Sequence, residues 1–172
     1  MALTTIPAAG AKLRGSVLSS LITEVRPLSA RMTSDQALAT SSTTLANVTD
    51  LAVACEANAT YDLHGVFVYT AGTVEDIKFA FTLPTGATFD TFAIALNSAD
   101  VFTQLLTVGI ASGTAVAYGG AGVGSPRMVF FQATLVMSST AGNLQVQAAQ
   151  NTSGGNASTV KIGSKMTLVR TS

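Results

Sequence analysis

The chain has 172 residues, of which only 10% are Asp, Glu, Lys or Arg, and its formal net charge is zero. Soluble domains carry charge on about a quarter of their residues, so this composition predicts a chain that buries much of its surface against copies of itself or a partner. The absence of a basic excess argues against nucleic acid as a partner. No segment reaches the roughly 20 apolar residues of a membrane helix, so we expect no membrane partner either.

The few charges are distributed unevenly along the chain. Residues 1–34 hold four basic residues and one acidic residue, residues 35–100 hold eight acidic and one basic, and residues 101–172 hold four basic and none acidic. Two interpretations remain open. Either the second and third blocks pair across a sheet or a subunit interface, or the spacing is due to chance.

The N-terminal residues 1–34 differ in pattern from the rest of the chain. An extended arm is expected first, followed by a helix of about three turns that ends before Pro27, because the residue before a proline leaves the helical region. Its apolar face consists of Leu13, Val17, Leu18, Leu21, Ile22 and Val25. This face docks either on the chain's own domain or on a partner. We favour the partner and assign residues 1–34 as an attachment segment.

From Asp35 onward the apolar residues recur with a period of two, which predicts β-strands separated by turns. The expected strands are residues 50–55, 59–69, 77–83, 88–96, 101–110, 115–118, 127–137, 144–149, 160–162 and 166–169. A long antiparallel β-domain with no helical interruption favours a jelly roll or a related sandwich. The sequence therefore predicts an all-β fold, with a jelly-roll-like β-sandwich over residues 35–172 that follows an N-terminal arm and short helix.

The expected strand 127–137 is apolar on both faces, with Met128 and Phe130 opposite Val129 and Phe131. Its second face must also be covered, and a subunit interface is the natural cover. We therefore take Met128, Phe130 and Gln132 as candidates for a trimer interface.

Residues that resemble catalytic or nucleotide-binding motifs have simpler interpretations. The glycine run 119–124 has Ser125 where a dinucleotide fingerprint needs its last glycine, so a surface loop is expected. His64 lies beside Asp62, and we interpret it as a sheet-face residue rather than a general base. Cys55 is the only cysteine, which excludes an internal disulfide or a cysteine zinc site, and it is expected to be buried.

Acidic residues do not form a recognisable metal site either. Asp50, Glu56 and Asp62 lack any fixed calcium-binding spacing, and Glu75-Asp76 is expected to be a solvated hairpin turn. We therefore expect no catalytic residues, no metal site and no cofactor, and predict that the protein is not an enzyme.

Three stretches resemble small virion proteins of tailed phages of actinobacteria. They are LSARMTSDQALATSSTTLANVTDL at residues 28–51, VACEANATYDLHGVFVYTAG followed by IKFAFTLPTGATFD, and the ending QAAQNTSGGNASTVKIGSKMTLVR. The similarity covers roughly residues 10–170. The chain departs from the pattern at Ala148, where an aromatic residue is common, and at Lys165-Met166. These departures affect packing rather than chemistry.

The resemblance implies a structural phage protein with a single β-domain. Together with the composition, it leads us to expect a homotrimer that decorates the head of a virion, made in the host cytoplasm and bound to the major capsid protein or another virion protein. Two alternatives stay open: a tail or baseplate protein that contacts the host surface, and a carbohydrate-binding module, since jelly rolls also serve as lectins.

Overall fold

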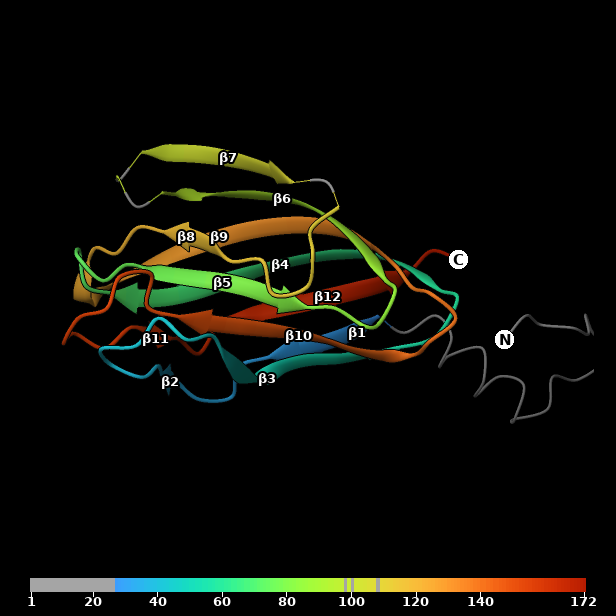
Figure 1. Cartoon of the computed structure of the whole chain (residues 1–172), viewed down its shortest axis with the longest axis horizontal. Helices are drawn as coiled ribbons and strands as arrows, with labels where there is room; N and C mark the ends of the chain where they lie inside the picture. Colours follow the sequence, from blue (N-terminus) through green and yellow to red (C-terminus); the bar gives the residue numbers. More distant parts are fainter. Residues whose placement is uncertain (1–26, 98, 100, 108) are drawn as a thin grey trace, which may run out of the picture.

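The computed structural model describes residues 27–97, 99, 101–107 and 109–172, and these residues form two antiparallel sheets with no helix among them. The large sheet follows the order β1 (Leu28–Arg31), β12 (Lys165–Arg170), β4 (Thr60–Ala71), β9 (Gly122–Val136), β6 (Thr88–Leu96) and β7 (Phe102–Thr107), with β11 (Thr159–Val160) beside β4 and β2 (Gln36–Ala37) beside β11. The small sheet follows the order β3 (Ala46–Cys55), β10 (Gly142–Ala149), β5 (Ile77–Thr82) and β8 (Val116–Tyr118). The two sheets form the two layers of a β-sandwich (Figure 1), which confirms the all-β prediction.

Each described strand pairs with its counterpart counted from the other end of the chain. Strand β1 pairs with β12, β2 with β11, β3 with β10, β4 with β9, β5 with β8, and β6 with β7. The described chain is therefore one long antiparallel hairpin that turns between β6 and β7. Further pairing of β10 with β5 and of β9 with β6 joins these pairs into the two sheets.

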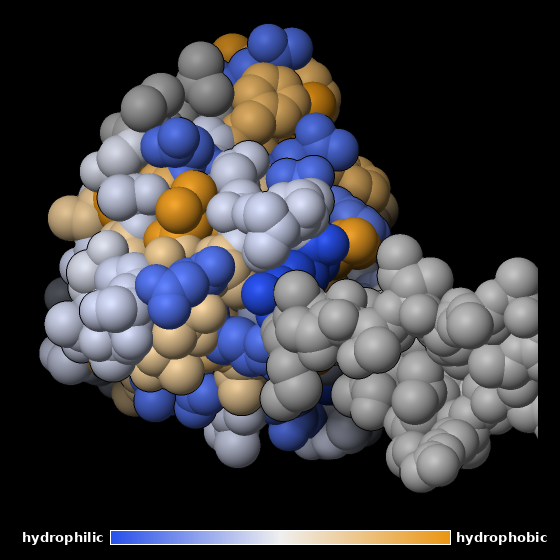
Figure 2. All heavy atoms as spheres, turned by 90° about the vertical axis from the view of Figure 1, so that its right-hand side faces the viewer, coloured by the Kyte–Doolittle hydropathy of each residue, from blue (hydrophilic) through white to orange (hydrophobic). Residues whose placement is uncertain are grey.

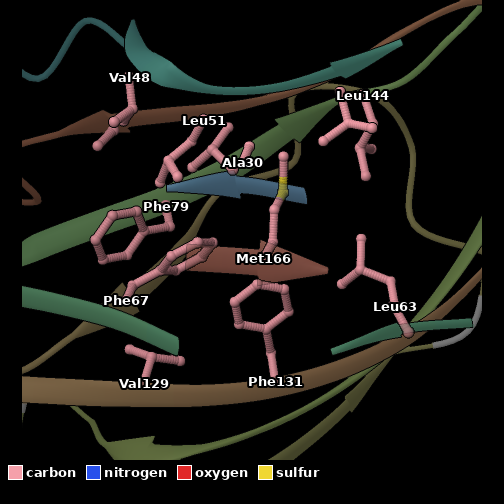
Figure 3. Packing of buried hydrophobic residues seen from close by; sticks show 14 of the residues in the cluster. Ala30, Val48, Leu51, Leu63, Phe67, Phe79, Val129, Phe131, Leu144 and Met166 are labelled. Atoms are coloured by element: carbon pink, nitrogen blue, oxygen red, sulfur yellow. The ribbon is translucent and has the colours of Figure 1, made fainter. Parts of the chain in front are cut away.

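The core lies between the two sheets, where one side chain in two from each strand points inward. Phe67 of β4 is at its centre, with ring centroids 4.4 Å from Phe131 of β9 and 4.7 Å from Phe79 of β5. Tilted contacts of this kind add to the stabilisation from area burial. Figure 3 shows these rings from both layers pointing toward one another, with Met166 and Leu63 beside them. The period of two is confirmed, since Tyr61, Leu63, Phe67 and Tyr69 at alternate positions of β4 are buried.

The described β-structure begins at Leu28, within residues 1–34 that the sequence assigned to the attachment segment. Strand β1 pairs with β12, and Ala30 and Met32 are buried in the core. Ala30 can be followed in Figure 3. A four-residue strand directly after a proline gives too little alternation to be recognised locally, so the sandwich begins at Leu28 rather than at Asp35. The expected arm and helix lie outside the described residues.

Ion pairs between described residues join the acidic block of the chain to its basic C-terminal block. Lys161 pairs with Asp35, and the Arg170 Nη1 atom lies 2.7 Å from Glu56 Oε2. These contacts agree with the interpretation that the two blocks pair within the fold. All four side chains remain at least one-third exposed, so each pair contributes little to stability.

Candidate interaction surface

The outward faces of the two sheets differ in chemistry. The small sheet presents amide side chains that bond within the sheet: Gln145 Nε2 donates to the carbonyl of Val48 at 2.9 Å, and Gln147 Nε2 donates to Asn47 Oδ1 at 3.0 Å. The large sheet instead presents apolar side chains on its outward face, called the outer face below. An exposed apolar patch of this kind marks an interaction site more often than a polar one does.

The registers of the paired strands order the outer face into rows that cross the strands. One row runs from Arg31 and Lys165 through Val66 and Phe130 to Ile94. The next row, two residues further along each strand, contains Thr167, His64, Gln132 and Phe92. A third contains Val169, Asp62, Thr134 and Asp90. Because side chains alternate between faces, all members of these rows point away from the core.

Apolar residues form a continuous band over three of these strands, β4, β9 and β6. Val66 opposes Phe130, Val68 opposes Met128, and Phe130 also opposes Ile94. The apolar band is defined here as Val66, Val68, Phe92, Ile94, Met128 and Phe130. Met128 is 52% exposed and Phe130 is 54% exposed, so large apolar surfaces face solvent. On the visible part of the end of the sandwich that lies at the right of Figure 1, hydrophilic residues lie between the apolar ones (Figure 2).

The outer face is hollowed beside the band. A groove of about 420 Å³ is lined by His64, Gly65, Val66, Phe92, Ile94, Phe130, Phe131, Gln132 and Lys165. A second hollow of about 350 Å³ is lined by Asp62, Leu63, His64, Asp90, Thr91, Phe92, Gln132, Ala133 and Thr134. The two share His64, Phe92 and Gln132, so they adjoin. The surface therefore changes from apolar to acidic within one depression.

The structure brings the three interface candidates together on this face. Met128, Phe130 and Gln132 are exposed at alternate positions of β9, while Val129 and Phe131 between them are buried. The sequence did not single out Val66, Phe92 or Ile94, although their alternation placed them opposite the core residues. These three residues share a face with Met128, Phe130 and Gln132 only because β4 and β6 pair with β9. The attachment candidates of residues 13–25 lie outside the described residues.

His64 and Cys55 occupy the environments that the sequence predicts for them. His64 is exposed on the outer face between Gln132 and Thr167. Cys55 is a buried free thiol whose pKa is raised by desolvation, as expected for packing rather than reactivity. Among the described residues, no three His, Cys, Asp or Glu side chains lie close enough together to bind a metal ion. The same part of the chain contains no helix that is long and apolar enough to cross a membrane.

The prediction of a solvated turn at Glu75-Asp76 is wrong. Both residues are buried, because the loop that follows β10 folds over them. Asn156 Nδ2 donates to Glu75 Oε1 at 3.0 Å, and the Gly120 amide donates to Asp76 Oδ1 at 2.7 Å. The glycine run that joins β8 to β9 is thus partly buried as well: a Cβ atom at Gly120 would lie 2.2 Å from the carbonyl oxygen of Gly72.

The free energy of unfolding should fall as the pH drops below about 4. Hydrogen bonds from Thr33 hold the pKa of Asp50 below its ordinary 3.8, and those from Asn156 hold the pKa of Glu75 below 4.5. The unfolded state therefore binds more protons in this range, so this stabilisation is complete above the ordinary values and is lost as pH falls through the folded ones. Urea unfolding at pH 3 to 7 measures it. Asp50→Asn should flatten the profile, and Asp62→Asn, which removes a carboxyl without a described hydrogen-bond partner, should not.

No protein-family model and no curated protein matches this chain. Among solved structures, the chain is similar to the VP2 subviral particle of infectious bursal disease virus, with 11% identity, 85% of this chain and 40% of that chain covered, and a TM-score of 0.20. It is also similar to infectious bursal disease virus Gt strain, with 9% identity, 85% and 37% covered, and a TM-score of 0.20. The chain spans less than half the length of these structures. A TM-score of 0.20 establishes neither a shared topology nor a shared function.

Proposed function

We propose that the protein is a non-enzymatic structural component of a tailed-phage virion, a homotrimer that decorates the head. The observation that carries the proposal is the outer face, where Met128 and Phe130 are about half exposed within a continuous apolar band. A monomer would leave this band in water. The resemblance of three sequence stretches to small phage virion proteins supplies the virion context.

The low charge content supports self-association through the same face. Closed cyclic assembly covers an apolar surface without leaving a free end to which further copies can add. Burial of the band would contribute about 25 cal/mol for each Å² of apolar surface, before the cost of association is subtracted. Met128, Phe130 and Gln132 are the proposed contacts around the three-fold axis.

The strand order supports the jelly-roll form of the sandwich. Strands β3 to β10 form a sheet of order β3-β10-β5-β8 and one of order β4-β9-β6-β7, and every connection between consecutive strands except β6–β7 crosses from one sheet to the other. This is the arrangement obtained when a long hairpin of eight strands is rolled into two sheets. Strands β1, β2, β11 and β12 then extend one edge of the larger sheet.

Attachment to the head is assigned to the N-terminal segment, with the apolar stripe of Leu13, Val17, Leu18, Leu21, Ile22 and Val25 docking on the major capsid protein or another virion protein. Residues 1–34 hold four basic residues and one acidic residue, which suits an acidic docking surface. The segment would link the β-domain to the shell and so cement neighbouring capsid subunits against the pressure of packaged DNA.

Removal of residues 1–26 tests this function. The cut stops before Pro27 because Leu28 already pairs with Leu168 in the large sheet. The truncated chain should fold and form trimers but should no longer bind virions that lack the protein, as measured by co-sedimentation. Leu18→Asp with Leu21→Asp should reproduce the loss, since an unpaired charge buried at an interface costs about 3–5 kcal/mol. Binding at the wild-type level would place attachment in the β-domain instead.

A further inference from the structure

The charges of the outer face are separated into two zones of opposite sign. Arg31 of β1 and Lys165 of β12 are directly opposite each other in the sheet, and both are exposed. Like charges at directly opposed positions destabilise a sheet. Neither lies within ion-pair distance of a carboxylate among the residues that the structure describes. The edge of the face therefore holds two adjacent cations without a described counter-charge.

The acidic zone lies further along the same face. Asp62 of β4 and Asp90 of β6 both oppose Thr134 of β9, and both carboxylates are exposed. Two strand spacings separate them, about 10 Å. Asp90 Oδ1 accepts a hydrogen bond from the Gly109 amide at 2.6 Å, which fixes one carboxylate without neutralising it. The acidic zone is thus also without a described counter-charge.

The groove lies between these zones, and the apolar band shares the row of Lys165 through Val66, Phe130 and Ile94. Lys165 lines the groove at one side, and the acidic hollow adjoins it at the other through His64 and Gln132. Val169, the β12 residue in the acidic row, is four residue steps along the strand from Lys165, so the zones are about 14 Å apart along the strands. Elsewhere, Lys161 and Arg170 pair with Asp35 and Glu56 within the chain. The charges left on the outer face match each other in number and are opposite in sign.

We propose that a second copy of this chain docks on the outer face with its Arg31–Lys165 pair against the Asp62–Asp90 pair of the first copy, the apolar band being buried beside this contact. This inference rests on the proposed self-association, and it identifies the charged residues that determine how the copies are oriented in it. Because the two zones lie on different strands, each copy can offer one zone to one neighbour and the other zone to the next. Head-to-tail contacts of this kind form a closed ring when the rotation between neighbouring copies closes, and a trimer requires a rotation of one third of a turn. The charges then fix the orientation of the copies, while the apolar band supplies most of the affinity.

Charge reversal in the full-length chain tests the contact. Arg31→Glu with Lys165→Glu makes both zones acidic, and Asp62→Lys with Asp90→Lys makes both basic, so each double variant should associate about a hundredfold more weakly, since like charges at an interface cost several kcal/mol. The chain with all four changes should regain wild-type association within about threefold. The measurement is sedimentation equilibrium at low salt and at 1 M salt. At 1 M salt the defects should shrink, because the screening length falls to about 3 Å.

A matched control separates the contact from net charge and from misfolding. Lys78→Glu with Lys161→Glu changes the net charge by the same amount as Arg31→Glu with Lys165→Glu, but Lys78 lies on the small sheet and Lys161 in the turn before β12. This control should associate as the wild type does, and all variants should keep the wild-type melting temperature within a few degrees. A quadruple variant that stays as weak as the doubles, or doubles that associate normally, would overturn the contact.

Mixing the two double variants separates this inference from the proposed trimer. One chain then offers only acidic zones and the other only basic zones, so attraction requires the two kinds to alternate. A closed ring of three cannot alternate, and the mixture should therefore not restore trimers. Restored even-numbered assemblies together with a dimeric wild type would refute the trimer and keep the contact. If the wild type is a trimer and the charge-reversal variants form trimers equally well, the contact is refuted but the trimer is not. If the wild type is a monomer, the contact and the trimer are both refuted.

Discussion

Replacing Gly65 by alanine is expected to destabilise the fold by about 2–3 kcal/mol, the usual cost of overpacking a well-packed core. Gly65 is at an inward position of β4, and the ring of Phe131 occupies the space where its side chain would lie. A Cβ atom there would be 2.5 Å from Phe131 Cζ and 2.6 Å from the carbonyl oxygen of Lys165. The ring can rotate away, but the carbonyl belongs to the paired backbone of β12 and has little freedom to move.

Urea unfolding measures this change: the urea concentration at the midpoint should fall, while the slope of the free energy of unfolding against urea concentration should stay the same. Gly124→Ala is the matched control, because nothing lies within 4 Å of a Cβ atom at Gly124, and it should be neutral or slightly stabilising. Phe131→Leu should recover part of the loss in the Gly65→Ala background, since it relieves one of the two close approaches. A midpoint that equals the wild-type value in Gly65→Ala would show that β4 and β12 are less tightly paired than described.

Aspartates placed in the apolar band should abolish assembly without unfolding the domain. Wild-type protein is expected to scatter light with three times the 17.5 kDa mass of the chain, and Met128→Asp with Phe130→Asp is expected to give the monomer mass at micromolar concentration. Both side chains are about half exposed in the single chain, so the domain loses little when they change. In an assembly each aspartate would be a buried unpaired charge, which costs about 3–5 kcal/mol and weakens association more than a hundredfold.

The control is the same change of charge on the small sheet. Ala54 and Asn143 oppose each other on β3 and β10 and are exposed, so Ala54→Asp with Asn143→Asp should leave the trimer intact. If this control dissociates the trimer while the band variant does not, the interface is on the small sheet. A wild-type chain that is monomeric at these concentrations would contradict the proposed trimer directly.

Strands and their inward faces could be predicted from the sequence because side-chain alternation is a local property. The alternation of Phe89, Thr91 and Ala93 with Asp90, Phe92 and Ile94 predicts one buried and one outward face, and the structure has the first set buried. Where the alternation is short the prediction failed, as at β1. It failed again at Glu75-Asp76, because residues that follow β10 cover this turn and no local pattern reports them.

The candidate site was predictable only in part. Met128, Phe130 and Gln132 share one strand, so their common face follows from spacing alone. The groove needs His64 and Val66 from β4 and Phe92 and Ile94 from β6 on either side of that strand. Which strands are neighbours depends on pairing between distant parts of the chain, and the registers of β4 and β6 against β9 cannot be read from any one segment.

By itself, the sequence determined that the chain is all-β, low in charge, and built of strands whose side chains alternate between two faces. The tertiary structure alone decided that Arg31 meets Lys165 at a sheet edge and that Asp62 and Asp90 flank one threonine. The physical reason is that alternation is set by the backbone of each strand, whereas rows across a sheet are set by hydrogen-bonded partners far apart in the chain. The sequence of a strand predicts which side chains share a face, but the neighbouring strands determine what surface those side chains form.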